Sequence, residues 1–325
     1  MLTYLTTKEG AGSLKRVVQR YDAEFGTWAE ERLYSSLASL CQVPRGLWVF
    51  CDAQRMGPEQ RALASRIYAV LKAEGSGVRL LNDPGKVLSR YEQLRAFREH
   101  GINGFAAYRL AEWEGRARFP VFVRIEKDHD GPRTPLLHTA DELREALAFM
   151  AMRGFEPESL IVVEFSDSAD SSGRFIKYGT FRVGDRIIAR HAIPSFDWNT
   201  KISNAQYDAA MLQLEQDYIE GNPHADLLMP IFELAGIEYG RIDYAYLDGR
   251  ISAWEINDNP NWLPRADAYP PGRVEVHLRL LRRCKEALRE LAQRVEPGPP
   301  FPLSFDPDWV WEAMRDGQTE AELRT

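Results

Sequence analysis

The chain has 325 residues, a formal net charge of −7, 44% hydrophobic residues and 27% charged residues. This composition is that of a globular protein with room for two or three domains. The acidic balance argues against nucleic acid as the main partner, because phosphate binding needs a basic surface. No apolar run reaches the roughly 18 residues of a membrane span, and the first residues lack a signal-peptide pattern. We therefore expect no membrane partner and a cytoplasmic location.

Several common catalytic and metal-binding patterns are missing from the sequence. Cys41, Cys51 and Cys284 form no CxxC pair, and six histidines form neither HxH nor HExxH. We expect reduced, buried thiols and no zinc site. GxGxxG, GxSxG and P-loop patterns are also absent, which argues against a dinucleotide fingerprint, a serine nucleophile elbow and a Walker-type phosphate site.

Residues 1–85 read as a small N-terminal α/β domain. Hydrophobic periodicity predicts helices, and short apolar runs predict strands. The helices are expected over residues 11–23, 28–40 and 58–74, and the strands over residues 46–52 and 78–82. A strand, a helix and a strand with short links indicate a parallel βαβ pair.

The rest of the chain divides into three stretches. Residues 86–165 predict helices over 87–100 and 139–152 and strands over 119–127 and 160–165. Residues 166–295 predict a polar loop over 166–173, strands over 175–182 and 186–192, helices over 205–220 and 227–235, a hairpin, and a helix over 274–294. Residues 296–325 form a proline-rich tail with one short amphipathic piece around Trp309–Met314.

The most informative stretch is 237–262, which reads as a hairpin around Asp248-Gly249. Asp243 and Glu255 lie between large apolar residues, where carboxylates are costly to bury unless a cation pairs with them. A two-residue turn would pair Asp243 with Trp254 and point Glu255 to the other face.

A three-residue loop closed by Gly249 is the register that we favour, because it pairs Asp243 with Ala253. Glu255 and Asn257 then lie on the same face as Asp243. Two carboxylates and an amide oxygen suit Mg²⁺ or Mn²⁺, with phosphates completing the coordination. The spacing alone leaves an ordinary hairpin with solvent-facing acids as the alternative.

Taken in order, the motifs resemble the ATP-grasp superfamily over roughly residues 80–263. Its ligase branch includes glutathione synthetase, D-alanine–D-alanine ligase and the ribosomal-protein glutamate ligase. The matching segments are Leu81-Asn82-Asp83-Pro84, Val121–Arg124, Ile161–Phe165, Asp243 and Glu255-Ile256-Asn257-Asp258-Asn259-Pro260. The last is the most specific. Gly173–Tyr178 and Ile188–His191 are also similar to a little-characterised ATP-grasp-like group.

The resemblance implies an α+β fold in which two α+β subdomains, residues 86–165 and 166–295, grip ATP behind the N-terminal α/β domain. Glu164 and Phe165 would lie against the adenine and ribose. Asp243, Glu255 and Asn257 would hold the metal on the phosphates.

Further residues fall where the family contacts phosphate or the acyl phosphate. These are Arg190, with Asn199 or Lys201. The charges of Arg124, Lys127, Lys177 and Arg190 could also neutralise developing charge on phosphoryl oxygens. Lys177 joins Arg190 and Asn199 as a predicted catalytic residue.

The sequence departs from the family at its two usual phosphate-binding lysines. The first position offers Arg90 or Gln93, or Lys86 with a shifted alignment, and the second has Arg124 with Lys127 three residues later. Arginine keeps the positive charge but adds a planar fork, so the exchange changes the geometry of phosphate binding.

The function that we expect is an ADP-forming, Mg²⁺- and ATP-dependent carboxylate–amine ligase that proceeds through an acyl phosphate. Its substrate would be a small molecule or peptide, with an amino acid or a peptide expected, and Arg265 is a candidate for binding a substrate carboxylate. A phosphotransferase on the same fold and a nucleotide-binding module without turnover are the alternatives. A homodimer is compatible with the sequence.

Overall fold

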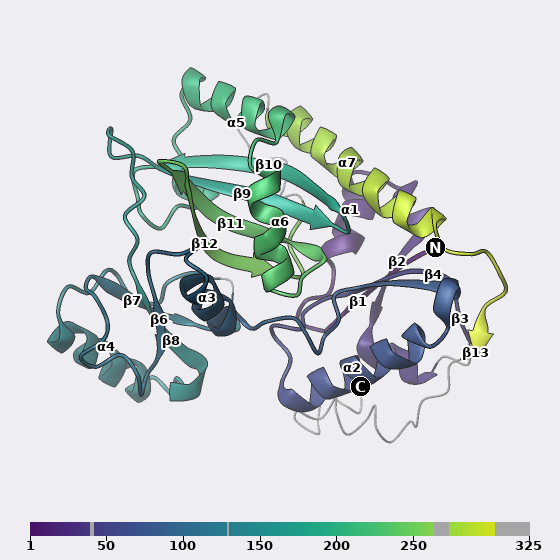
Figure 1. Cartoon of the computed structure of the whole chain (residues 1–325), viewed down its shortest axis with the longest axis horizontal. Helices are drawn as coiled ribbons and strands as arrows, with labels where there is room; N and C mark the ends of the chain where they lie inside the picture. Colours follow the sequence, from purple (N-terminus) through teal and green to yellow (C-terminus); the bar gives the residue numbers. More distant parts are fainter. Residues whose placement is uncertain (40–41, 129, 263–272, 303–325) are drawn as a thin grey trace.

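The computed structural model describes residues 1–39, 42–128, 130–262 and 273–302. Three larger sheets follow one another across the molecule, each with its own helices (Figure 1), and two short strands form a fourth sheet. The N-terminal sheet lies at one end, a four-stranded antiparallel sheet lies in the middle, and a small three-stranded sheet lies at the other end. The short helix predicted around Trp309–Met314 and the candidate Arg265 lie outside the described residues.

The N-terminal sheet is parallel and has the strand order β2-β1-β4-β5. Its strands are β1 (Leu2–Thr6), β2 (Ala29–Leu33), β4 (Gly46–Phe50) and β5 (Val78–Leu81). Its helices are α1 (Ser13–Arg20), η1 (Phe25–Thr27), η2 (Tyr34–Ser39), α2 (Pro58–Lys72) and η3 (Gly75–Gly77). β3 (Gln42–Val43) pairs with β13 (Phe301–Pro302). The predicted strands, the predicted parallel βαβ pair and two of the three predicted helices are confirmed.

The helix predicted over residues 28–40 is wrong. Residues Ala29–Leu33 form β2, which pairs in parallel with β1, and a 3₁₀ helix follows. Glu31 of β2 also accepts hydrogen bonds from the first backbone N–H groups of α1, including that of Leu14 at 2.9 Å. Pairing with a strand far away in the sequence therefore outweighed the helical spacing of the apolar residues.

The middle sheet is antiparallel and has the order β10-β9-β11-β12. Its strands are β9 (Phe175–Val183), β10 (Arg186–Ser195), β11 (Tyr239–Leu247) and β12 (Arg250–Asn257). The associated helices are η5 (Ile202–Asn204), α5 (Ala209–Gly221), α6 (Ala225–Leu234) and α7 (Arg273–Gln293). One face packs Ile242, Tyr244 and Ile256 against Phe232 of α6 and its neighbours. Because side chains alternate along a strand, the residues between these point to the opposite face.

The third sheet has the order β6-β8-β7, and α4 covers one face of it (Figure 1). Its elements are β6 (Ala107–Arg109), β7 (Val121–Ile125), α4 (Ala140–Met152), η4 (Pro157–Ser159) and β8 (Leu160–Glu164). α3 (Arg90–Glu99) begins at a capping box formed by Ser89 and Glu92. Leu94 of α3 packs against Ile161 and Val163 of β8. α3 therefore lies between this sheet and β12.

Two side-chain amides cover the outer edge of β12. Asn103 donates to the carbonyl of Ala253 and accepts from its N–H, both at 2.8 Å. Gln93 accepts from the N–H of Ile256 at 2.9 Å and donates to its carbonyl at 3.4 Å. The backbone groups of an edge strand are thereby satisfied without another strand.

Asn82 joins the N-terminal sheet to the middle sheet. Its amide nitrogen donates to the carbonyls of Phe50 and Tyr239, at 3.0 and 2.8 Å. Its amide oxygen accepts from the N–H groups of Glu238 and Tyr239, at 2.8 and 2.9 Å. The side chain is fully buried and uses all four of its hydrogen-bonding positions. Asn82 thus fixes the start of β11 beside the end of β4.

The cysteines and the helix lengths bear on two further expectations from the sequence. Cys51 and Cys284 are free and buried, as predicted, whereas Cys41 lies outside the described residues. Among the helices of the described segments, none is both long enough and apolar enough to cross a membrane.

Candidate functional site

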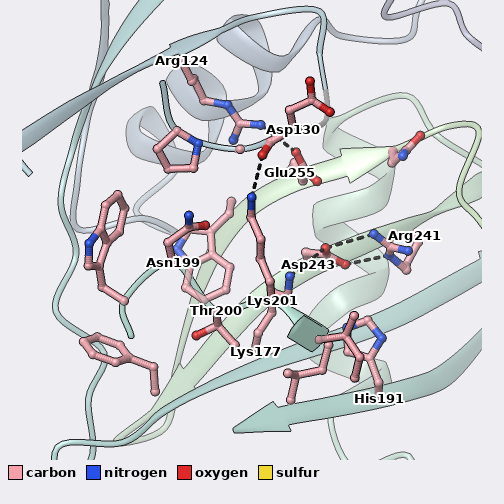
Figure 2. A pocket seen from close by; sticks show the side chains of 18 of the residues that line it. Arg124, Asp130, Lys177, His191, Asn199, Thr200, Lys201, Arg241, Asp243 and Glu255 are labelled. Carbon is pink, nitrogen blue, oxygen red and sulfur yellow. Dashed lines mark hydrogen bonds and ion pairs between the residues drawn. The ribbon is translucent and has the colours of Figure 1, made fainter. Parts of the chain in front are cut away.

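A cavity of about 940 Å³ lies between the middle sheet and the third sheet, with helix α1 at its edge. Its floor is the face of the middle sheet that α6 leaves uncovered, and its opposite wall comes from α3, β7 and β8. Side chains of α1 close the end nearest to the N-terminal sheet. Figure 2 shows acidic and basic side chains pointing into this space from opposite sides.

The hairpin turn has two residues, so the predicted three-residue loop is wrong. Asp248 and Gly249 have φ angles of 51° and 78°, and Leu247 pairs directly with Arg250. Positive φ angles at both central positions are those of a type I′ turn, which Asp-Gly favours. Counting back from this turn, Tyr244 pairs with Ala253.

A β-bulge then restores the predicted grouping of the acids. The register shifts between Asp243 and Tyr244, so that Trp254 is the extra residue and Asp243 pairs with Glu255. The predicted pairing of Asp243 with Ala253 is therefore wrong, but both carboxylates lie on the cavity face. Asn257, two residues after Glu255, lies on that face as well.

Asp243 is held by basic residues of its own sheet. Arg241, two residues earlier on β11, donates to both of its carboxylate oxygens at 2.7 and 3.0 Å (Figure 2). Lys177 of β9 lies 3.9 Å from the same carboxylate. Burial lowers the pKa of Lys177, and the charge of Asp243 opposes that shift. The predicted catalytic Lys177 therefore lines the cavity beside a predicted metal ligand.

Arg241 is a cavity residue that the sequence interpretation missed. The signal was present, because residues two apart on a strand share a face and Arg241 stands two before Asp243.

Glu255 is held by basic residues of the opposite wall. Arg124 of β7 lies 3.2 Å from its carboxylate, and Arg90 of α3 contacts the same oxygen. Burial, reinforced by the charge of Arg90, lowers the pKa of Arg124 to about 10, so it remains a cation at neutral pH. Arg124 lines the cavity, whereas Arg90 is 3% exposed and also donates to the carbonyl of Glu126.

Of the remaining predicted nucleotide-binding residues, two line the cavity and one does not. Phe165 lines the cavity, with its ring centroid 6.0 Å from Trp198 and 6.4 Å from Phe175. Glu164 also lines it, and its carboxylate forms a 2.7 Å ion pair with Arg118. Lys127 is exposed and is not among the residues around the cavity. Phe175 starts β9, and Gly179, four residues later on the same strand, pairs with Asp243, so the aromatic side chains and the carboxylates lie at different positions along the cavity floor.

The two other predicted catalytic residues line the cavity from β10 and the loop after it. Arg190 is 5% exposed, lies 3.3 Å from the carbonyl of Trp262 and contacts the ring of His191. Burial and then the charge of Arg190 hold the pKa of His191 well below its usual value, so this ring is neutral. Asn199 lies beside Lys201, which donates to the carbonyl of Asp130 at 2.8 Å across the opening (Figure 2).

His191 can occupy its position only because Gly179 on the next strand has no side chain. A Cβ atom at Gly179 would lie 2.4 Å from the imidazole ring, far inside contact distance. The imidazole ring thus lies over the backbone of Gly179. Because Gly179 also pairs with Asp243 of β11, the polar ring of His191 belongs to the same part of the cavity floor as the Asp243 carboxylate.

The donors on β11 and β12 suit a hard divalent cation that shares phosphate ligands. Within residues 1–39, 42–128, 130–262 and 273–302, no three His, Cys, Asp or Glu side chains could hold a metal ion by themselves. Asp243 and Glu255 supply two facing carboxylates, and Asn257 supplies an amide oxygen. Mg²⁺ commonly uses one or two protein carboxylates together with substrate phosphates. This donor set therefore fits Mg²⁺ that arrives with a nucleotide.

No protein-family model and no curated protein matches the chain. Solved structures do match. D-alanine–D-alanine ligase from Bacillus anthracis has a TM-score of 0.52 at 17% identity, over 90% of this chain and 97% of that one. Its complex with ATP has a TM-score of 0.50 at 16% identity, with the same coverage. The D-alanine–D-alanine ligase of Coxiella burnetii has a TM-score of 0.50 at 12% identity, over 97% of both chains.

At such low identity, the similarity bears on the fold and not on the substrate. It agrees with the mixed sheets and helices and with the order of motifs along the sequence. The prediction of fold is confirmed: the chain has the α+β ATP-grasp fold.

Proposed function

We propose that the protein is an ATP- and Mg²⁺-dependent ligase that joins a carboxylate to an amine and releases ADP. The observation that carries the proposal is the direct pairing of Asp243 with Glu255 on the cavity face of β11 and β12. Basic side chains from both walls meet this pair. Phosphoryl transfer needs positioning and charge neutralisation more than it needs a protein nucleophile.

The cavity offers separate places for the base and the phosphates of ATP. The rings of Phe165, Phe175 and Trp198 suit the flat, apolar adenine. Arg124 and Lys177 lie beside the carboxylates, where they can bind phosphate oxygens. The Bacillus anthracis ligase that shares this fold has been crystallised with ATP, which supports the assignment of ATP.

Asp243, Glu255 and Asn257 would hold Mg²⁺. When bound, Mg²⁺ would neutralise phosphate charge at this end of the nucleotide. Arg124 and Arg90 already form ion pairs with Glu255. On binding, Mg²⁺ would replace the arginines at Glu255, and the phosphates of ATP would replace Glu255 at the arginines. The half-buried carboxylate would then have a counter-charge at every stage.

The proposed chemistry needs only substrates and the residues that position them. An oxygen of the substrate carboxylate attacks the γ-phosphorus, which forms an acyl phosphate and releases ADP. The amine then attacks the acyl carbon, and inorganic phosphate leaves as the amide bond forms. Arg190, Arg241 and Asn199 would donate to the oxygens on which negative charge develops. Burial raises the pKa of Cys51 well above its usual value and that of Cys284 to about 12, so neither described cysteine supplies a thiolate.

One observation favours a nucleotide-binding module without turnover as the second candidate. Both arginines that replace the expected lysines already form ion pairs with Glu255. If these ion pairs persist when ATP binds, the carboxylate stays neutralised and Mg²⁺ loses a ligand.

The experiment measures ADP release by the full chain with ATP, Mg²⁺ and common amino acids, singly and in pairs. We expect release that requires both a carboxylate and an amine substrate, and a hydroxamate product when hydroxylamine replaces the amine. Asp243→Asn should lower the rate about 100-fold or more. Asp248→Asn, the same chemical change in the turn of the same hairpin, should leave the rate unchanged.

The remaining outcomes separate the candidates. A phosphorylated product without an amide bond identifies a phosphotransferase. ATP binding without ADP release under any substrate pair supports the binding module. A rate unaffected by Asp243→Asn would overturn the assignment of the metal ligands.

A further inference from the structure

Helix α1 presents two arginines to the end of the cavity nearest to the N-terminal sheet. Leu14 and Val17 are 1% and 2% exposed and pack into the core. Arg16 and Arg20 lie on the exposed side, and both line the cavity. Residues four apart on a helix are neighbours, so the two guanidinium groups can reach a single anion.

The position of Arg16 is fixed by local structure. Its guanidinium donates to the amide oxygen of Asn261 at 2.9 Å. Gly12, just before the helix, has a φ of 96°, and a Cβ there would lie 3.0 Å from the guanidinium. Glu31 holds the same helix end by accepting from the N–H of Leu14. Arg16 is therefore oriented toward the cavity by the fold.

Arg16 and Arg20 differ in their partners from three other arginines that line the cavity. Arg124, Arg241 and Arg273 each form an ion pair with a glutamate or aspartate. Among the residues that the structure describes, neither arginine of α1 has a carboxylate partner.

The charge around the cavity is positive although the chain as a whole is acidic. Of the described residues that line it, eight are Lys or Arg and four are Asp or Glu, whereas the whole chain has a net charge of −7. Concave surfaces of one sign concentrate ligands of the opposite sign. The excess of positive charge favours an anionic ligand there.

Chain continuity locates this surface relative to the proposed chemistry. Asn261, which binds Arg16, follows the predicted metal ligand Asn257 by four residues. The aromatic end, around Phe165, includes Phe175 at the start of β9, whereas Asn257 is level with Phe181, six residues farther along β9. ATP with its base at that end would leave the α1 end for the second substrate.

We propose that the acceptor substrate carries a second negatively charged group, a carboxylate or a phosphate, in addition to the carboxylate that reacts, and that Arg16 and Arg20 bind it. The proposal rests on the proposed ligase function for the identity of the reacting group. The recognition itself rests only on the paired guanidinium groups. The two parts can therefore be tested separately.

The test is calorimetric binding to the full chain with Mg²⁺ and a non-hydrolysable ATP analogue. The probes are L-glutamate against L-glutamine, and O-phospho-L-serine against L-serine. At least one anionic probe should bind ten-fold or more tightly than its neutral counterpart. Which pair shows the preference tells carboxylate from phosphate.

The variants give the proposal its control. The double variant Arg16→Gln/Arg20→Gln should lose the preference and keep its melting temperature, since both side chains are exposed. Lys15→Gln changes an exposed charge on the same helix that does not line the cavity, and it should keep the preference. Equal binding of acid and amide, or a preference that survives in the double variant, would overturn the proposal.

Failure of the ligase function has a different signature. A chain that binds the anionic probe through Arg16 and Arg20 but releases no ADP with any amine retains the anion site and refutes the ligase. A chain that releases ADP equally well with charged and neutral acceptors retains the ligase and refutes the anion site.

Discussion

Two arginine–glutamate clusters border the cavity, one fully buried and one half-buried, and they are built differently. Arg273 at the start of α7 donates hydrogen bonds of 2.5 and 2.6 Å to the two carboxylate oxygens of Glu215 of α5, and both side chains are 3% exposed. Glu215 also accepts from the N–H of Ala192 on β10. All three residues belong to the layer of the middle sheet, so this cluster is closed within one part of the molecule.

The second cluster spans the cavity. Glu255 is on β12, whereas Arg90 and Arg124 come from α3 and β7 across the opening. Glu255 is more exposed, at 15% of its side chain. The same ionic chemistry therefore stabilises one packed unit in the first case, and in the second it places charge where a ligand can compete for it.

The largest expected effect comes from breaking the closed cluster. Glu215→Gln leaves the guanidinium of Arg273 buried without its counter-charge, and the free energy of unfolding should fall by about 3–5 kcal/mol. Urea denaturation measures this. The control on the same helix is Glu220→Gln, which breaks an exposed pair with Arg279 and should cost less than about 1 kcal/mol. Similar losses in both variants would contradict a special role for the buried pair.

Breaking the cluster that spans the cavity should affect activity more than stability. Glu255→Gln is expected to lower ADP release about 100-fold, equivalent to about 2.7 kcal/mol. Its loss of stability should be smaller than that of Glu215→Gln, because Arg90 keeps its hydrogen bond to the carbonyl of Glu126. Steady-state rates and urea denaturation on the same preparations decide the matter. The comparison fails if Glu255→Gln is the less stable of the two and retains full activity.

The smallest expected effect concerns acid sensitivity near the closed cluster. Burial, with the charges of Arg190 and Arg273, lowers the pKa of His277 to about 2. The unfolded chain then binds a proton that the folded chain excludes. The stability contributed by the neutral ring is present above about pH 6.5 and is lost as the pH falls toward the folded pKa. Between pH 7 and pH 5 this loss amounts to about 2 kcal/mol.

His277→Gln removes that titration. Melting curves from pH 5 to pH 8 should show a smaller loss of stability on acidification than in the unmodified chain. His100→Gln, at an exposed position, should leave the pH profile unchanged. An unaltered acid dependence in His277→Gln would place the proton-excluding group elsewhere, with the buried His191 as the next choice.

Local patterns predicted the elements well, because apolar spacing and turn residues act over a few positions. The helix that becomes α2 begins with Pro58 at its first turn, and the strand that becomes β8 is a short run of apolar residues. The stretch 28–40 failed because its strand exists only through pairing with Leu2–Thr6. The local sequence of that stretch does not indicate which strand it pairs with.

The site shows the same limit at the level of single residues. Asp243 and Glu255 were expected on one face, and they are, but a bulge at Trp254 puts them there instead of a longer loop. Trp254 packs against the cluster of Tyr91, Leu94 and Phe105, which comes from another layer. Arg90 likewise could be assigned a charge from the sequence but not a partner, because Glu255 follows it by 165 positions.

The two amide side chains on the edge of β12 have a mechanical consequence. Asn103 and Gln93 attach the α3 layer to Ala253 and Ile256, and Glu255 lies between these two attachment points. Any rotation of that layer against the middle sheet would have to turn about these two hydrogen-bonded points or break them. The carboxylate of Glu255, which lies between them, would keep its position relative to α3 in such a rotation.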